Sequence, residues 1–331
     1  MTIAVLGAGA WGTALAAVMA GDGTPVRLWG RDGATIEAIE RRRENPRYLP
    51  GIALPDMMAT TRLETALDGA DLALLVVPVK ATREVARAVL DRAPQIALVC
   101  CSKGLEAQTG ETPAVTVERL APRAPVAALS GPSFARDVAA GLPTAVTLAC
   151  PALDDATALA ARLSRPRLRL YAHDDRRGVE LGGALKNVMA IAVGAARGLG
   201  LGASAEAAVV ARGFDELVRI STTLGARRET LNGLSGLGDL VLSCASPQSR
   251  NFAYGLALGE GRSTDGMPLA EGARSAASAA RVSRRHGLDC AIVEGVDRML
   301  RGAVRADALV EELLSRPLKR ESASAGPGLS G

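Results

Sequence analysis

The sequence predicts an α/β protein in which an N-terminal doubly wound parallel sheet is followed by an all-α C-terminal domain. Two observations lead to this fold class. Short, continuously apolar runs alternate with helical patterns up to about residue 174, as they do when strands are buried on both faces between crossover helices. Beyond that point no convincing strand pattern appears, and segments rich in Ala, Leu and Arg follow helical spacing to about residue 318.

Seven apolar runs in the first part have the length of buried strands, and these are 2–6, 25–29, 70–77, 95–101, 125–130, 144–150 and 168–172. Helical patterns lie between them, at 10–21, 33–43, 80–92 and 154–164. In the second part, Gly-rich turns such as 233–239 separate the helices. We therefore expect one domain at 1–174, a second at 175–318, and a disordered tail at 319–331, which is small and polar.

Composition and charge argue against several classes of protein. The 331 residues carry 39 basic and 35 acidic side chains, a net charge of +4, with no dense run of Lys and Arg. This balance argues against a nucleic-acid partner or a charged membrane surface. Residues 1–21 contain no charged side chain and are mostly apolar. No basic residue precedes Ile3, however, and three glycines interrupt the stretch, so we expect neither a signal peptide nor membrane insertion.

Cysteine usage indicates the compartment. The five cysteines show no metal-ligand spacing and their number is odd. Without an export signal, this pattern predicts reduced thiols, a cytoplasmic location and no bound metal. The long apolar stretches of the second part favour a homodimer.

The first predicted strand leads directly into a glycine-rich turn, with Gly7, Gly9 and Gly12 in the spacing G-x-G-x-x-G. In a Rossmann domain the first glycine permits the tight turn, the second lets a pyrophosphate approach the backbone, and the third lets the helix pack closely on the strand. The N-terminus of that helix offers free N–H groups to the phosphates. This context favours a dinucleotide site over an ordinary Gly-rich turn.

The end of the second predicted strand bears on the choice between NAD and NADP. An NAD site usually has an acidic residue there to hold the ribose hydroxyls. In this chain Arg31 takes that place and Asp32 comes one residue late. Arg31 is therefore a candidate partner for the 2′-phosphate of NADP, or else an arginine in a solvated loop, and NAD remains open.

Lys186 is the one charged residue between Leu181 and Ala196, in a stretch that has the pattern of a buried helix. The chain has only four lysines among its 39 basic residues, and lysine, unlike arginine, can lose its proton when buried. On a helix, Gly182 and Gly183 would lie beside the lysine and leave open space for a ligand. Lys186 is therefore a candidate acid/base or anion-binding group, with a salt bridge to a carboxylate of the other domain as the structural alternative.

Three further stretches place polar residues where a ligand of an open α/β sheet would lie. Two follow predicted strands, and the third, 236–251, contains a polar loop whose Arg, Ser and Asn suit a phosphate. The candidate residues are Lys103, Gly131, Ser133, Asp239, Ser249, Arg250 and Asn251.

Five motifs together resemble a known family. "GAGAWGTALA", "SKGLE", "SGPSFARDVAAGLPTA", "GVELGGALKNVMAIAVGA" and "GLGDLVLSCASPQSRN" are similar, in order and spacing, to bacterial-type NAD(P)-dependent glycerol-3-phosphate dehydrogenase over about residues 2–318. The resemblance implies interconversion of sn-glycerol 3-phosphate and dihydroxyacetone phosphate with NAD or NADP, for glycerophospholipid synthesis.

The resemblance also implies roles for individual residues. Lys186 matches the catalytic acid/base, and the substrate-contacting positions are Lys103, Gly131, Ser133, Lys186, Asp239, Ser249, Arg250 and Asn251. The positions that match cofactor contacts are Gly7, Gly9, Ala10, Trp11, Gly12, Arg31, Lys103, Ala135, Arg250, Leu269 and Glu271.

This chain departs from the family pattern at four places, which are Ala10, "PVK" at 78–80, "HDDRR" at 173–177 and "FAY" at 252–254. None of them includes Lys186, Asp239 or Arg250. Two other interpretations remain open at this stage: a related dehydrogenase for another small phosphorylated or carboxylated alcohol, and a non-catalytic dinucleotide sensor.

Overall fold

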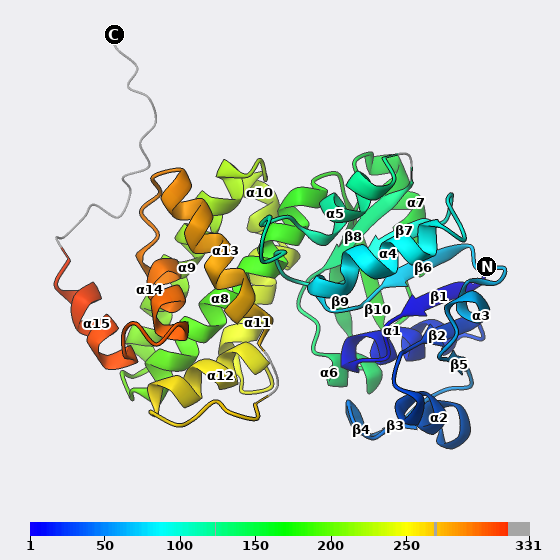
Figure 1. The fold of residues 1–331 in the computed structure, drawn as a ribbon, viewed down its shortest axis with the longest axis horizontal. Helices are drawn as coiled ribbons and strands as arrows, with labels where there is room; N and C mark the ends of the chain where they lie inside the picture. Colours follow the sequence, from blue (N-terminus) through cyan, green and yellow to red (C-terminus); the bar gives the residue numbers. More distant parts are fainter. Residues whose placement is uncertain (123, 268–269, 317–331) are drawn as a thin grey trace, which may run out of the picture.

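The computed structural model describes residues 1–122, 124–267 and 270–316 and confirms the predicted fold class. Eight strands form one sheet in the order β10-β9-β8-β7-β6-β1-β2-β5, and helices of the second part stand beside it (Figure 1). Six neighbouring strands are parallel, namely β1 (Ile3–Leu6), β2 (Val26–Trp29), β5 (Met58–Thr60), β6 (Leu72–Leu75), β7 (Ala97–Cys100) and β8 (Val126–Ser130).

The prediction of a parallel sheet is wrong at one edge. β9 (Thr144–Ala149) runs antiparallel to β8, and β10 (Leu168–His173) runs parallel to β9. Between β8 and β9 the chain forms only the short helix α6 (Ala135–Ala139). An antiparallel neighbour needs no long crossover, and an apolar run alone carries no information about strand direction.

Short elements between residues 44 and 68 were absent from the sequence prediction. β3 (Glu44–Asn45) and β4 (Leu49–Ala53) form a separate antiparallel pair, and β5 completes the edge of the main sheet beside β2. These strands are two to five residues long and only partly buried, so they lack the apolar runs that mark the central strands.

Both faces of the main sheet are buried. Ile3 and Val5 belong to a core with α1 (Ala10–Ala20) and α7 (Leu153–Leu163). Ala4 and Leu6 point to the opposite face, where helices complete a second core. The other helices of this part are α2 (Gly33–Arg42), α3 (Leu63–Leu67), α4 (Thr82–Leu90) and α5 (Pro113–Leu120). A 3-10 turn at Val79–Ala81 precedes α4.

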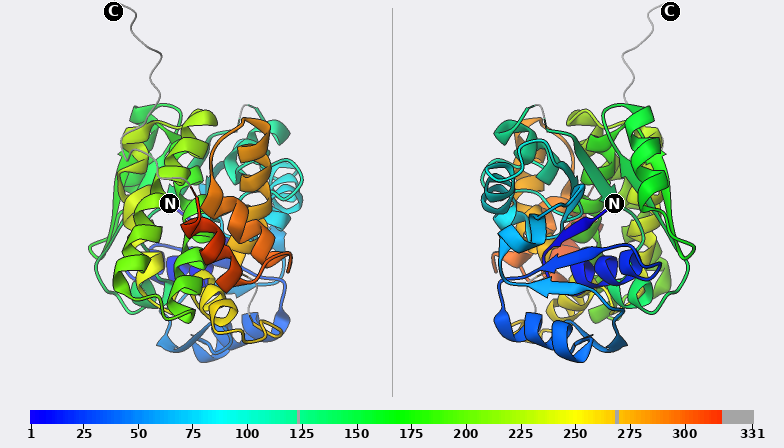
Figure 2. Two further views of the ribbon diagram at one scale, coloured as in Figure 1. Left: turned by 90° about the vertical axis from the view of Figure 1, so that its left-hand side faces the viewer. Right: turned by 90° about the vertical axis from the view of Figure 1, so that its right-hand side faces the viewer.

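The second part is built around α8 (Arg176–Gly198), the helix that contains Lys186. Side views show this part and the sheet lying one behind the other along the long axis (Figure 2). The surrounding elements are α9 (Ala203–Thr223), α10 (Arg228–Leu231), the π-helical turn η2 (Leu234–Gly238), α11 (Asp239–Ala245), α12 (Arg250–Gly259), α13 (Glu271–Arg285), α14 (Ala291–Leu300) and α15 (Ala306–Leu314). The stretch 233–239, predicted as a Gly-rich turn, is thus mostly this π-helical turn.

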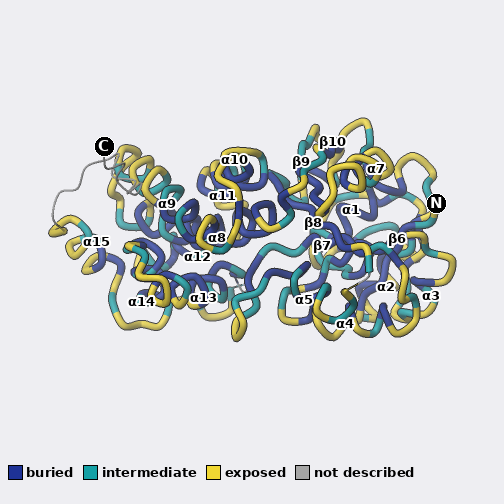
Figure 3. Tube along the Cα trace, turned by 90° about the horizontal axis from the view of Figure 1, so that it is seen from above, coloured by how far each residue is buried: buried dark blue, intermediate teal, exposed yellow. Residues whose placement is uncertain are grey.

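α8 is long and apolar enough to cross a membrane by length and composition, but 94% of its apolar window is buried inside the protein. Buried segments run through the middle of both parts (Figure 3). The helix begins after Asp175, whose carboxylate accepts hydrogen bonds from the backbone N–H groups of Gly178 and Arg227, both at 2.8 Å. The unusual "HDDRR" sequence therefore still provides an N-cap for α8.

α8 and α12 touch through their backbones. A methyl group added to Gly194 or Gly198 of α8 would overlap a carbonyl oxygen of α12. The reverse holds for Gly255 and Gly259 of α12, which face carbonyl oxygens of α8. The two helices therefore pack with no side-chain layer between them along this line.

Candidate active site

The predicted site residues come from both parts of the molecule and meet at the carboxyl edge of the sheet. Lys103 follows β7, and Gly131 and Ser133 follow β8. Lys186 lies on α8 and Asp239 begins α11. Ligands of open α/β sheets bind at this edge, so the location agrees with a catalytic cleft.

Lys186 is 8% exposed and its ammonium group has two partners. Nζ donates to Asp239 Oδ1 at 2.5 Å and to Ser243 Oγ at 2.7 Å. Asp239 and Ser243 are one turn apart on α11, so a single helix face holds the lysine. Ser243 was not among the predicted site residues, although its i, i+4 spacing from Asp239 on a helix would have indicated it.

Asp239 joins Lys186 to a second lysine. Its Oδ2 accepts a hydrogen bond from Lys103 Nζ at 2.6 Å, and Lys103 also donates to the carbonyl oxygen of Gly131 at 2.7 Å. Ser133 Oγ lies 3.4 Å from the same Nζ. Lys186 does form a salt bridge, but its carboxylate does not come from the other domain, because Asp239 belongs to the same helical part. The residue of the cluster that comes from the sheet part is Lys103.

Burial and charge together adjust the acidity of Lys186. Burial, helped by the nearby charge of Lys103 and opposed by Asp239, lowers its pKa to about 8. A group whose pKa lies near neutral pH can both give and take a proton in one catalytic cycle. The lysine is therefore suited to acid/base chemistry as well as to charge stabilisation.

The expected open space beside Lys186 is not provided by its neighbouring glycines. A methyl group on Gly182 would lie 2.7 Å from the carbonyl oxygen of Ser235 in η2, and one on Gly183 would overlap Ser130 Oγ. The prediction is wrong because both glycines allow close packing, one against the π-helical turn that precedes Asp239 and the other against the end of β8.

Asn187, next to Lys186, belongs to a chain of amide groups. Its Oδ1 accepts from Asn251 Nδ2 at 2.9 Å, and Asn251 Oδ1 accepts from the backbone N–H of Gly272 at 2.9 Å. The side chain of Asn187 also donates to the carbonyl oxygen of Lys103 at 3.4 Å. This chain connects α8, α12 and the start of α13 with the residue that follows β7.

Ser249, Arg250 and Asn251 were expected in a polar loop, but they form the beginning of α12. Ser249 is the N-cap, with Oγ accepting from the N–H of Phe252 at 3.3 Å, and Arg250 is the first helical residue. The interpretation as a loop failed because a Ser followed by polar residues marks a helix N-terminus as well as a loop. Arg250 is exposed there, where backbone N–H groups and the helix dipole favour an anion.

The glycine turn has the geometry that a dinucleotide requires. Gly7 adopts a φ of +130°, and a side chain on Gly12 would overlap the carbonyl oxygen of Gly7. Gly9 has no atom within 4 Å of the position where a Cβ would lie, so the backbone there is open to a ligand. No side chain caps the N-terminus of α1. These residues fit a pyrophosphate.

Further predicted cofactor residues gather beside the turn. Ala10 and Trp11 of α1 pack in one apolar group with Ala135, the first residue of α6. The indole N–H of Trp11 is buried and makes no hydrogen bond in the protein. A buried donor without a partner is costly, so this group also fits a site that a bound cofactor completes.

At the end of β2, Arg31 is exposed, and Asp32 is engaged elsewhere. Asp32 caps α2, accepting from the Ala34 N–H at 3.2 Å and from Thr35 Oγ1 at 2.9 Å. It also pairs with Arg47 at 2.8 Å. This arrangement leaves the nearby carboxylate occupied and places two arginines close to the expected ribose position.

The remaining predicted cofactor residues are Leu269 and Glu271. Leu269 lies outside the described residues. Glu271 begins α13, and burial raises the pKa of its carboxyl group against the opposing charge of Arg250. It lines a hollow of about 260 Å³ between the two parts, together with Val79, Lys80, Gly104–Gln108, Arg274 and Ser275.

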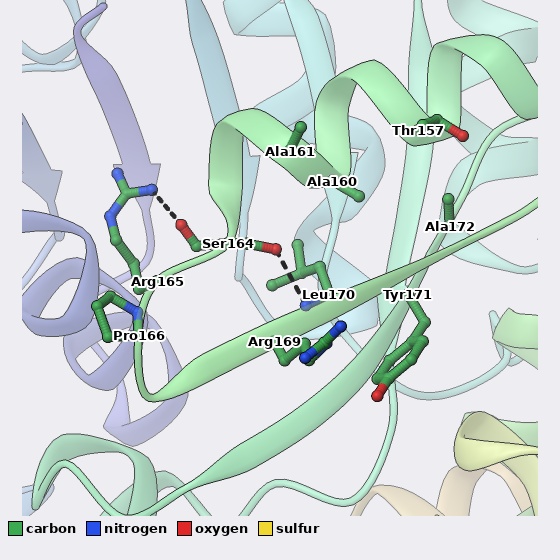
Figure 4. A pocket seen from close by; sticks show the side chains of 10 residues that line it. All are labelled: Thr157, Ala160, Ala161, Ser164, Arg165, Pro166, Arg169, Leu170, Tyr171 and Ala172. Carbon is green, nitrogen blue, oxygen red and sulfur yellow. Dashed lines mark hydrogen bonds between the residues drawn. The ribbon is translucent and has the colours of Figure 1, made fainter.

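A wider groove of about 580 Å³ lies away from this site. It is formed by α7 and the edge strand β10, and Ser164, Arg165 and Tyr171 are among its lining residues (Figure 4). None of the predicted site residues lines it. The lysine cluster and the adjoining hollow between the two parts are therefore the candidate active site.

Comparison with known proteins identifies the family of the chain. Residues 2–156 match the family model described as the NAD-dependent glycerol-3-phosphate dehydrogenase N-terminus, and residues 175–311 match its C-terminus. Glycerol-3-phosphate dehydrogenase [NAD(P)+] of Mesorhizobium japonicum is 55% identical over 97% of this chain and 94% of its own length. The Chelativorans relative of the same name is 53% identical over 97% of this chain and 98% of its own length.

Solved structures show the same similarity. The crystal structure of glycerol-3-phosphate dehydrogenase from Coxiella burnetii has a TM-score of 0.89 and 39% identity, covering 95% of this chain and 99% of that one. The Saccharomyces cerevisiae glycerol-3-phosphate dehydrogenase, at 24% identity and a TM-score of 0.80 over 94% and 98% of the chains, shares the fold. On these matches, the chain belongs to the NAD-dependent glycerol-3-phosphate dehydrogenase family.

Proposed function

We propose that the protein interconverts dihydroxyacetone phosphate and sn-glycerol 3-phosphate by hydride transfer with NADPH or NADH, and that Lys186 is its general acid/base. The observation that carries this proposal is the buried ammonium group of Lys186, bonded to Asp239 and Ser243, with a pKa of about 8. A sensor that only binds a dinucleotide has no need for such a group inside a helical domain.

The bound nicotinamide cofactor supplies the hydride that reaches C2 of dihydroxyacetone phosphate. Lys186 hydrogen-bonds the C2 carbonyl oxygen and gives it the proton, so that the carbonyl becomes a secondary alcohol. Asp239 keeps Lys186 oriented towards the oxygen, and the charges of Lys103 and Lys186 stabilise the negative charge that develops there. In the reverse direction neutral Lys186 takes the hydroxyl proton.

The substrate phosphate is placed at the N-terminus of α12. Arg250 contributes a charged fork for phosphate oxygens, and the backbone N–H groups of 249–251 add donors there. Gly131, Ser133 and Asn251 border the substrate, while Gly7, Gly9, Ala10, Trp11, Gly12, Arg31, Ala135 and Glu271 hold the cofactor, with Lys103 and Arg250 shared between the two ligands.

The same proposal covers organisation and location. Residues 1–174 bind the dinucleotide and residues 175–318 complete the substrate site. We place the enzyme in the cytoplasm as a homodimer, where it supplies glycerol 3-phosphate for glycerophospholipid synthesis. Free cysteines support the cytoplasmic location, and all five, Cys100, Cys101, Cys150, Cys244 and Cys290, are buried thiols.

The decisive experiment follows NADPH absorbance while dihydroxyacetone phosphate is added to the purified protein. We expect rapid oxidation of NADPH and a stoichiometric yield of glycerol 3-phosphate. A panel of other small phosphorylated or carboxylated ketones tests the rival dehydrogenase. If one of them gives a higher kcat/KM than dihydroxyacetone phosphate, the substrate assignment fails, and no oxidation with any of them would favour a non-catalytic binding protein.

A further inference from the structure

We propose that Glu180 is a positioning residue for this reaction: from α8 it anchors the end of segment 101–112 and thereby sets the position of Lys103. The proposal rests on the proposed function above, because Lys103 is part of that active site. Glu180 precedes Lys186 on the same helix and is 6% exposed. It makes no contact with the lysine cluster in the hydrogen-bond network, so its effect must pass through the segment it holds.

Both carboxylate oxygens of Glu180 bind the sheet part of the molecule. Oε2 accepts from the hydroxyl of Thr112 at 2.6 Å, and Oε1 accepts from the backbone N–H of Ala114 at 2.8 Å. Thr112 is the N-cap of α5, yet its side chain makes no capping bond within that helix. An acidic residue of α8 therefore binds one free N–H group of α5 and places its charge at the positive dipole end of this helix.

Segment 101–112 runs from the end of β7 to this capped helix and contains Lys103 near its beginning. Its middle is attached to α13 by polar side chains that bond residues 105–107 at 2.7–3.3 Å, from Ser275, Ser278 and Arg281. Its start is attached to α11 through Lys103 and Asp239. Three helices of the second part, α11, α13 and α8, thus hold this segment of the first part. Glu180 of α8 holds its far end.

This attachment matters because Lys103 makes short, directional contacts. Its Nζ bonds Asp239 at 2.6 Å and the Gly131 carbonyl at 2.7 Å, and hydrogen bonds weaken steeply with poor distance or angle. If the end of the segment shifts relative to α8, Lys103 moves with its backbone while Asp239 stays on α11. Substrate contacts that need both groups are then weakened.

The groups around Glu180 act on the charge of its carboxyl group, and a glutamine substitution removes that charge. Burial raises the pKa of its carboxyl group to about 7, while Thr112, the Ala114 N–H and Arg176 favour the charged form. Glu118 is the other titratable group that acts on it, and it favours the neutral form. Gln at position 180 keeps the shape and one acceptor but removes the charge, so the helix end loses its acidic cap without a cavity being formed.

The chain offers a matched control in Glu216 of α9. Its carboxylate accepts from the backbone N–H groups of Ile292 at 2.9 Å and Val293 at 3.0 Å, at the start of α14. Burial raises the pKa of Glu216 to about 7 as well. Both carboxylates therefore cap a helix from a buried position, but Glu216 connects two helices of the same part and is remote from segment 101–112.

The experiment compares Glu180→Gln with Glu216→Gln in the full-length enzyme. Thermal unfolding first establishes that both variants fold with similar losses of Tm. We expect Glu180→Gln to lower kcat/KM for dihydroxyacetone phosphate by about tenfold, since a charge-assisted hydrogen bond is replaced by a neutral one. The NADPH Kd should rise by a smaller factor, because Lys103 is only one of the proposed cofactor contacts. Glu216→Gln should stay within twofold in both. Hydrogen exchange of 101–112 should accelerate in Glu180→Gln alone.

A double-variant cycle tests the route through Lys103. If Glu180 acts by placing this lysine, Glu180→Gln should have little further effect on kcat/KM in a Lys103→Ala background. The proposal is overturned if Glu180→Gln and Glu216→Gln lower kcat/KM equally at equal Tm, or if the two effects at 180 and 103 simply add. A wild-type protein without activity on dihydroxyacetone phosphate would instead refute the proposed function, and hydrogen exchange would still report on the attachment.

Discussion

The glycine turn and the lysine cluster meet at the same sheet edge but are built in opposite ways. The turn uses backbone from six consecutive positions, Gly7 to Gly12, and its fit depends on missing side chains. The cluster uses charged side chains of Lys103, Lys186 and Asp239, which are far apart in the chain. One site is therefore sensitive to added volume and the other to charge and protons, and each prediction below tests that contrast.

The largest effect is expected at Lys186. Lys186→Ala should lower kcat by about 10²–10⁴-fold, the usual contribution of a general acid/base, because the substitution removes the proposed proton donor. The NADPH Kd should not change, since the turn is untouched. Lys186→Met serves as a control that leaves less of a cavity. Turnover near that of wild type in either variant would remove Lys186 from its role.

The turn should respond to volume instead. Gly9→Ala should preserve Tm, because nothing lies within 4 Å of the new methyl group, yet weaken NADPH binding at least about tenfold by blocking the approach of the pyrophosphate. Gly12→Ala should destabilise the fold by about 1–3 kcal/mol through overpacking. Calorimetry and cofactor titration separate the two effects, and equal losses of stability would contradict the contrast between them.

Above neutral pH, the pH dependence should belong to the lysine cluster. Reduction of dihydroxyacetone phosphate needs protonated Lys186, so its kcat/KM should fall about tenfold per pH unit above a pKa of about 8. Oxidation of glycerol 3-phosphate needs the neutral lysine and should rise with pH through the same range. Both the fall for reduction and the rise for oxidation should be absent from the pH profiles of Lys186→Met. A pH dependence that survives this change must come from another group.

Arg31 is an exception to the contrast between a cofactor site built from backbone and a charged lysine cluster, because it adds a charge to the cofactor site. Arg31→Ala should raise the KM for NADPH about tenfold by removing a charge-assisted bond to the 2′-phosphate, and leave the KM for NADH within twofold. Steady-state measurements with both cofactors test this expectation. Equal changes for the two cofactors would mean that Arg31 does not contact the 2′-phosphate.

The smallest effect is expected at Ser243. Ser243→Ala removes one of the two hydrogen bonds to Lys186, and a bond of about 1 kcal/mol corresponds to about fivefold in kcat. The remaining bond to Asp239 keeps the lysine in place. A loss as large as that of Lys186→Ala would show that Ser243 takes part directly in proton transfer.

The same contrast explains what could be predicted from the sequence. The glycine turn and the central strands are local patterns, so their place and geometry followed from spacing alone. Lys186 could be singled out because lysine is rare in this chain and a charge inside an apolar helix is unusual. The direction of β9 could not be predicted, because the pairing of β8 with β9 depends on how segment 131–143 returns to the sheet.

Errors at the site had a common physical cause. Gly182 and Gly183 looked like space for a ligand because the backbone of η2 and the side chain of Ser130, which fill that space, are distant in sequence. The alternative of a salt bridge between Lys186 and the other domain failed for the same reason, because Asp239 is also distant in sequence. Contacts between distant segments carry no periodic signal, so only the folded structure identifies them.

The direct backbone contact between α8 and α12 has a consequence for substrate length. Lys186, the proposed proton donor, lies on one helix, and Arg250, the proposed phosphate-binding group, begins the other. Because no side-chain layer separates these helices, substitutions between them cannot change the distance from Lys186 to Arg250 gradually. A change of substrate size through these helices would require sliding one past the other in helical steps of about 1.5 Å per residue. Evolution or engineering along this route therefore faces discrete jumps, and point substitutions elsewhere would alter rate more readily than substrate length.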